Sequence, residues 1–129
     1  ILNRRLSLCY RYLAVDQTWT SAKASCEREG GHLLWVESRE VADHLKAFLS
    51  SSSDLSKRHV SVGIHMINGR DWIFTDGRMI NFTDWADGEP NDASENCVVL
   101  GWYYNFQWND YPCSSVHIGP ALCQIDSVL

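Results

Sequence analysis

No lysine or arginine follows Arg78 in this chain of 129 residues. The segment up to Arg78 carries all eleven basic residues against nine acidic ones, and the remainder carries seven acidic residues and no basic one. A surface rich in carboxylates and poor in cations repels nucleic acid and anionic lipid, which argues against both as partners of the second part of the chain. The same excess of carboxylates favours a bound cation.

The sequence also lacks any apolar run near the roughly 18 residues that a membrane-spanning helix needs. We therefore expect no membrane insertion by this domain. It has no internal repeat, and its length predicts a single domain over residues 1–129. With 45% hydrophobic and 21% charged residues, the chain can bury a core and is not typical of disordered proteins.

None of the cysteines stands in a Cys-x-x-Cys pair, which argues against a zinc site or a redox motif. Five cysteines in so short a chain are typical of an oxidising compartment. Because an odd number cannot pair completely, spacing alone leaves the pairing open. The five are Cys9, Cys26, Cys97, Cys113 and Cys123.

Helical periodicity is confined to the first half of the chain. A first helix, ended by Gly30 and Gly31, is predicted by three residues at steps of three and four, namely Trp19, Ala22 and Cys26. A second helix begins after a Ser38 cap and ends at the serines of 50–53. Its apolar stripe consists of Val41, Ala42, Leu45, Phe48 and Leu49.

Strand-like segments precede and follow these helices, with Asp76-Gly77 as a tight turn between two of them. The segments are 10–16, 59–66, 71–75, 78–82, 97–104 and 121–125. Most strands follow the helices instead of alternating with them. This order predicts an α+β fold in which two helices flank antiparallel strands.

Residues 83–96 are too polar and too often interrupted to form a helix or a strand. They hold five acids, one proline and one glycine in fourteen positions, and Cys97 follows them directly. A long loop within a compact domain is usually either functional or disordered. We expect this one to be functional.

Oxygen-bearing side chains gather in this loop and shortly after it. They are Glu89, Asn91, Glu95, Asn109 and Asp110. Hard oxygen ligands favour calcium over zinc or copper, because calcium accepts 6–8 oxygens in irregular geometry. Five protein ligands leave coordination positions for two adjacent hydroxyls of a sugar, which the same Glu and Asn side chains can hydrogen-bond.

Pro90 fits this scheme, because a cis bond before proline has a small cost and could turn Glu89 and Asn91 toward one centre. Taken alone, Glu-Pro-Asn is more commonly a solvated acidic turn. Trp108-Asn109-Asp110 taken alone is more commonly an aromatic core residue followed by a turn. Their positions on either side of Cys97, with Cys113 just beyond, favour a site built from both.

From about Cys9 to Cys123 the chain resembles the C-type lectin-like domain family. The matching motifs are Cys9-Tyr10, Thr18-Trp19 with Ala22 and Cys26, Gly30-Gly31-His32-Leu33, Trp72 with Asp76-Gly77, Gly88-Glu89-Pro90-Asn91, Glu95-Asn96-Cys97, Trp108-Asn109-Asp110 with Cys113, and Cys123. The resemblance implies the C-type lectin-like fold with a long calcium-binding loop and a core at about 9–125. It also implies disulfides between Cys26 and Cys123 and between Cys97 and Cys113.

The resemblance further implies a binding module that is not an enzyme. Calcium would be its cofactor, held by all five oxygen-bearing residues, and glycans its partners. Glu89, Asn91, Glu95 and Asn109 would also contact the sugar. The family associates Glu-Pro-Asn with mannose-type sugars, which here include mannose, fucose, glucose and N-acetylglucosamine.

Two alternatives stay open beside mannose-type binding. The aromatic residues Trp102, Tyr103, Tyr104 and Phe106 could stack on a sugar and admit galactose, although packing in a core strand explains them as well. A protein-binding receptor domain with the same fold is the other alternative. A metal-dependent hydrolase lacks support, since Ser114, Ser115 and His117 form no nucleophile motif.

Three further residues carry predictions of their own, namely Asn81, Cys9 and His65. Asn81-Phe82-Thr83 is an N-glycosylation acceptor and, with the cysteines, predicts a secreted protein or the extracellular domain of a membrane protein. Cys9 has no partner in the implied pairing, so it would join a cysteine further upstream or link two chains of a homo-oligomer. His65 lies where some relatives place extra calcium ligands, and we interpret it as an ordinary histidine.

Overall fold

The computed structural model describes residues 1–91, 94–114 and 119–126. Within these residues the chain forms two α-helices, α1 (Trp19–Arg28) and α2 (Arg39–Ser51), and a short 3-10 helix, η1 (Trp102–Tyr104). The strands are β1 (Leu2–Asn3), β2 (Leu8–Leu13), β3 (His32–Leu33), β4 (Val60–Ile67), β5 (Asp71–Phe74), β6 (Cys97–Gly101), β7 (Gln107–Tyr111) and β8 (Ala121–Gln124).

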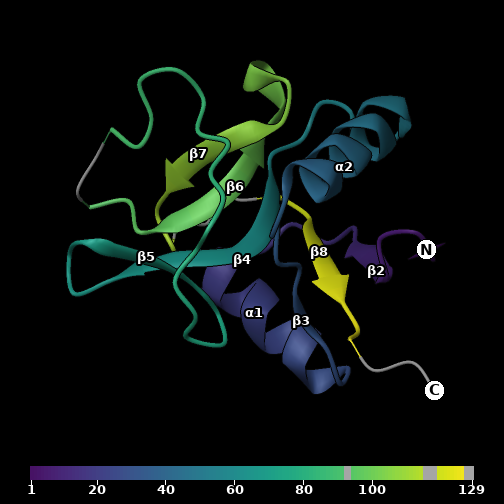
Figure 1. Cartoon of the computed structure of the whole chain (residues 1–129), viewed down its shortest axis with the longest axis horizontal. Coiled ribbons are helices and arrows are strands. Elements are labelled where there is room, and N and C mark those ends of the chain that lie inside the picture. The colour runs from purple at the N-terminus through teal and green to yellow at the C-terminus, as the bar shows by residue number, and fades with distance from the viewer. Residues whose placement is uncertain (92–93, 115–118, 127–129) are drawn as a thin grey trace.

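The strands run in the order β1-β2-β8-β4-β6-β7, with β3 paired to β8 and β5 paired to β4. All pairs are antiparallel except β4 with β8. In Figure 1 the long strand β4 crosses the centre of the molecule, with the β6–β7 hairpin on one side of it and β8 and β2 on the other. The α+β prediction, two helices flanking antiparallel strands, is confirmed.

Side-chain caps begin both helices. The Thr18 hydroxyl accepts a hydrogen bond from the Ser21 backbone N–H at the start of α1, and the Ser38 hydroxyl accepts one from the Val41 N–H at the start of α2. Each cap satisfies a backbone donor that the helix itself leaves unpaired. The predicted Ser38 cap is therefore confirmed.

The core consists of two apolar clusters on opposite faces of the sheet. One contains the stripe of α2, including Leu45 and Leu49, and the other contains the buried face of α1 around Trp19. Strand β6 contributes to both, because successive side chains of a strand point to opposite faces: Val98 belongs to the first cluster and Val99 to the second.

Two disulfides fasten the sheet. Cys26 of α1 is bonded to Cys123 of β8, and Cys97 at the start of β6 is bonded to Cys113 just after β7. These are the two pairings that the family resemblance implies. Cys9 is a free, half-buried thiol on β2.

The structure corrects two predicted strands. Residues 78–82 form no strand and contribute only one isolated bridge, between Ile73 and Met79. The strand predicted at 97–104 ends at Gly101 and continues as η1. The sequence did not predict the strands β1, β3 and β7. Strands β1 and β3 have only two residues each, and β3 pairs with β8, about ninety residues further along the chain.

The segment between β5 and β6 extends far from the sheet. Its second part, residues 83–96, is called the long loop below; it lies on the left in Figure 1, opposite the N-terminus and the end of β8. Among the residues that the structure describes, none of the helices has the length and apolarity needed to cross a membrane.

We expect Leu45→Ala to destabilise the fold by about 2–5 kcal/mol, because Leu45 is fully buried between α2 and the sheet and its truncation leaves a cavity. Urea denaturation measures the loss. Met79→Ala is the control, since Met79 is 59% exposed and its truncation opens no cavity. Equal stabilities of the two variants would contradict this account of the core.

Candidate functional site

Backbone hydrogen bonds hold the start of the long loop against β7. The Trp108 N–H donates to the Asp84 carbonyl at 2.8 Å, and the Ala86 N–H donates to the Trp108 carbonyl at 3.0 Å. The indole rings of Trp85 and Trp108 meet edge to face, with centroids 5.4 Å apart. The loop therefore starts beside the residue that directly precedes Asn109.

A buried carboxylate ties the same part of the loop to α2. The Asp84 side chain is 4% exposed and lies 2.8 Å from the Lys46 ammonium and 3.3 Å from the Arg39 guanidinium. No motif in the sequence marks Asp84. The only hint is that this acid stands between the aromatic residues Phe82 and Trp85, and its partners on α2 lie about forty residues away in the sequence.

The middle of the loop turns back toward β7. Gly88 adopts a φ of +82°, a conformation that favours glycine, and the Glu89–Pro90 peptide is cis. The Asn91 backbone N–H donates to both carboxylate oxygens of Asp110, at 3.3 and 3.2 Å. The structure thus brings Glu89-Pro90-Asn91 to Asp110.

The carboxylates of this region interact strongly. Burial raises the pKa of Glu89 to about 7, helped by the charge of Asp110, by a hydrogen bond between the Glu89 and Asp110 side chains, and by the charge of Glu95. Asp110 is 1% exposed, while Glu89 and Glu95 are half-buried. Three of the five predicted oxygen donors therefore share one electrostatic environment that disfavours negative charge without a counter-ion.

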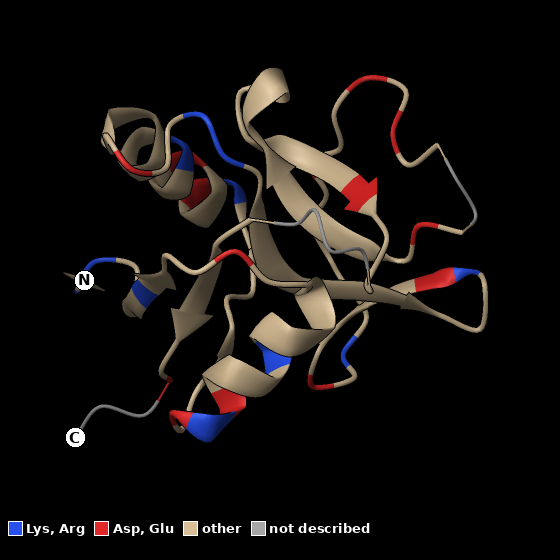
Figure 2. Ribbon diagram, turned by 180° about the vertical axis from the view of Figure 1, so that it is seen from behind, with Lys and Arg blue, Asp and Glu red and all other residues tan. Residues whose placement is uncertain are grey.

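No basic side chain relieves this charge from within the loop or from β7. Figure 2 shows acidic positions along both segments and no lysine or arginine on either, as the charge distribution of the sequence requires. A divalent cation would supply the missing counter-charge. The donors are carboxylate and amide oxygens, so their chemistry fits calcium.

The carboxyl groups that the structure describes in this region are not arranged as a metal site. Among the described residues, no three His, Cys, Asp or Glu side chains are grouped so as to hold a metal ion. Glu89 and Asp110 instead share a hydrogen bond. Asn109 precedes Asp110 on β7, with its Cβ beside Gly101, and the disulfide of Cys97 restrains the chain two residues after Glu95.

The other predicted residues lie apart from this cluster. The Asn81 side chain is exposed, as a glycosylation acceptor requires. His65 is half-buried and stacks on Trp19, with ring centroids 5.2 Å apart, and burial lowers its pKa below the usual value. Of the aromatic residues near the hairpin tip, Phe106 is buried in the core, whereas Tyr103 and Tyr104 are exposed.

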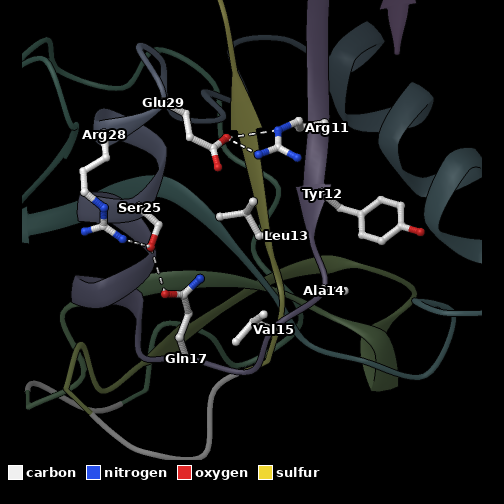
Figure 3. A pocket seen from close by; sticks show the side chains of 9 residues that line it. All are labelled: Arg11, Tyr12, Leu13, Ala14, Val15, Gln17, Ser25, Arg28 and Glu29. Carbon is white, nitrogen blue, oxygen red and sulfur yellow. Dashed lines mark hydrogen bonds and ion pairs between the residues drawn. The ribbon is translucent and has the colours of Figure 1, made fainter.

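A cavity of about 320 Å³ lies between β2 and α1, away from the long loop (Figure 3). Its polar side chains already bond one another. Arg11 pairs with Glu29, and Arg28 and Gln17 both hydrogen-bond Ser25. This cavity has no cluster of catalytic or metal-binding groups, and the carboxylates around Glu89 are the stronger candidate site.

The profile of the lectin C-type domain family matches residues 15–125. A C-type lectin of Micrurus corallinus is 32% identical over 93% of this chain and 79% of its own length. The versican core protein of Rattus norvegicus is 29% identical over 82% of this chain. This chain spans only 4% of that versican, so most of versican has no counterpart here.

Solved structures share the fold. The C-type carbohydrate-recognition domain of cow CD23, determined in the presence of a GlcNAc2Man3 oligosaccharide, has a TM-score of 0.79 and 28% identity, covering 95% of this chain and 91% of that one. A calcium-independent type II antifreeze protein has a TM-score of 0.80 and 24% identity, covering 95% and 88%. The second likeness concerns the fold alone.

We expect Asp84→Asn to destabilise the protein by about 2–3 kcal/mol, because it leaves the largely buried Lys46 ammonium without its counter-charge. Adding Lys46→Met should recover part of the loss, since the unpaired charge is then removed as well. Urea denaturation of both variants checks this. If the double variant were less stable than Asp84→Asn, the pair would not hold the loop in this way.

Proposed function

The chain belongs to the lectin C-type domain family, and from this membership we propose that it binds carbohydrate through calcium, with a preference for mannose-type sugars. The family consists of non-enzymatic binding domains, so no bond in the ligand is made or broken. The observation that carries the proposal is the approach of Glu89-Pro90-Asn91 to Asp110 in an acidic region without local cations.

We assign the calcium ligands to Glu89, Asn91, Glu95, Asn109 and Asp110. Calcium held there would supply a Lewis acid for two neighbouring hydroxyls of a sugar. The side chains of Glu89 and Glu95 would accept hydrogen bonds from these hydroxyls, and the amides of Asn91 and Asn109 would donate to them. The Asn91 backbone N–H orients the Asp110 carboxylate, which is itself buried.

Glu-Pro-Asn supports mannose-type ligands over galactose, by resemblance to the family. The cow CD23 domain was determined in the presence of a GlcNAc2Man3 oligosaccharide, which supports carbohydrate as the ligand class. A single sugar in an open site binds with about millimolar affinity, roughly −4 kcal/mol. Useful avidity then requires several copies, and we propose a homo-oligomer in which the free Cys9 links chains or joins a segment outside this sequence.

An extracellular setting agrees with this function. The two disulfides need an oxidising compartment, and the exposed Asn81 is then available for glycosylation. We propose that the domain is secreted or is the extracellular domain of a membrane protein.

Protein recognition is the competing function. The antifreeze neighbour shows that this fold exists in a calcium-independent form. A domain that binds a polypeptide through the same fold does not depend on the three interacting carboxylates. Calcium dependence therefore separates the two functions.

Binding to a glycan array with and without a chelator tests the proposal. We expect binding to mannose-type glycans that the chelator abolishes. Glu89→Gln should weaken calcium binding by about tenfold or more, because it removes an anionic ligand. Glu27→Gln, on the exposed face of α1, is the matched control and should leave calcium and glycan binding unchanged. Chelator-insensitive binding, or the absence of glycan binding, would favour the protein-binding function.

Calcium affinity should fall as the pH drops below about 7. The calcium-free protein holds a proton on Glu89 below its raised pKa of about 7, and calcium must displace that proton. Above this pH the carboxylate is already charged and the affinity levels off. Each pH unit below the pKa then costs up to about tenfold when one proton is displaced. Calorimetric calcium titrations from pH 5.5 to 8 measure this, and a pH-independent affinity would contradict it.

A further inference from the structure

The tip of the β6–β7 hairpin is an uncharged aromatic surface beside Asn109. Residues 97–109 contain no lysine, arginine, aspartate or glutamate. Tyr103 and Tyr104 of η1 are 70% and 43% exposed. Aromatic residues are enriched and charged residues depleted at the centres of binding surfaces, and the missing charges argue for a neutral ligand.

The tip has a defined shape. The Phe106 N–H donates to the Gly101 carbonyl at 2.8 Å, and the Phe106 side chain is buried in the core. Both Asn105 and Phe106 adopt positive φ angles, of 54° and 61°, which residues other than glycine rarely do. Backbone conformations of this kind persist where surrounding contacts enforce them and often occur at functional sites. Tyr104 is therefore presented by a fixed turn.

Gly101 places the Tyr104 ring next to Asn109. A Cβ atom at Gly101 would lie 2.9 Å from Cδ2 of Tyr104 and 3.6 Å from Cβ of Asn109. Only the absence of a side chain at Gly101 lets the ring rest there. Tyr104 and Asn109 thus flank the same point of the hairpin, and Asn109 is one of the residues proposed above to hold calcium and sugar.

Tyr103 is directed differently. Its ring stacks on Trp102, with centroids 4.1 Å apart, and meets His59 at 5.5 Å. The Trp102 N–H donates to Nδ1 of His59. The two exposed tyrosines therefore belong to separate contacts: Tyr104 lies on the Asn109 side of the hairpin, and Tyr103 lies against Trp102 and His59.

Resting on the proposed function, we propose that Tyr104 forms a second subsite, in which its ring stacks on the sugar residue next to the one bound at calcium. The apolar C–H face of a pyranose matches an aromatic ring, and the Cβ of Asn109 lies beside Gly101, where the Tyr104 ring also rests. The ligand is then an oligosaccharide of at least two residues, neutral at the second position. Tyr104 is a specificity-determining residue that contacts no calcium.

The test compares affinities for mannose and for an α-linked mannose disaccharide in saturating calcium, by calorimetry or competition. Wild-type protein should prefer the disaccharide by about three- to tenfold, the range that one aromatic contact supplies. Tyr104→Ala should lose this preference and keep its affinity for mannose and for calcium. Tyr104→Phe should keep the preference, because stacking needs the ring and not the hydroxyl.

Two further variants control for the fold of the tip. Gly101→Ala keeps Tyr104 in the chain but displaces its ring, so it should also lose the preference. Tyr103→Ala removes a more exposed tyrosine and should retain the preference. If Tyr103→Ala and Tyr104→Ala lost the preference equally, the shape of the tip and not the Tyr104 ring would be responsible, and the subsite would be refuted.

The outcomes separate the subsite from the proposed function. Calcium-dependent mannose binding with no disaccharide preference in the wild type, or with an unchanged preference in Tyr104→Ala, overturns the subsite alone. It would also point to a protein ligand for the aromatic tip. A wild-type protein that binds neither sugar in calcium overturns both proposals.

Discussion

The crowding of three acidic side chains is the constraint on which the rest of the site depends. Burial and the charges of Asp110 and Glu95 raise the pKa of Glu89 to about 7, so Glu89 takes up negative charge only at a cost in free energy, and a loop free to move would separate these side chains. The fold prevents separation by holding the long loop at both ends. Asp84 binds α2 at the start, and the disulfide of Cys97 restrains the end.

The distribution of charge follows from the same constraint. The helices carry cations that neutralise nearby acids, as Lys46 and Arg39 do for Asp84. A lysine in the long loop or on β7 would neutralise the carboxylates in the same way and would leave no charge for a metal. The absence of basic residues after Arg78 therefore agrees with the proposed cation site, although it stabilises nothing by itself.

The features that could be predicted correctly from the sequence are those that depend on residues close to one another in the chain. The stripe of α2 and its Ser38 cap depend on residues within one helix, and both agree with the structure. The strand expected at 78–82 was wrong because its pairing with β5 stops after Ile80 and leaves only one isolated bridge, at Met79. The turn at Asn105 and Phe106 and the Asp84–Lys46 contact are set by tertiary packing, so neither has a sequence pattern. Motifs nominate five oxygen donors, but they do not predict the hydrogen bond that Glu89 and Asp110 share.

The two proposals place two kinds of recognition on separate parts of the domain. At the carboxylates, the proposed binding would depend on calcium and so on proton and calcium concentrations, since the donors must be charged. At the hairpin tip, Tyr104 is positioned by Gly101 and by the buried Phe106, which do not titrate. A change of pH would therefore alter whether a glycan is held, while the tip would set which glycan is preferred. Asn109 is one of the proposed calcium ligands and its Cβ lies beside Gly101, so the preference at the tip would act on a sugar that calcium already holds.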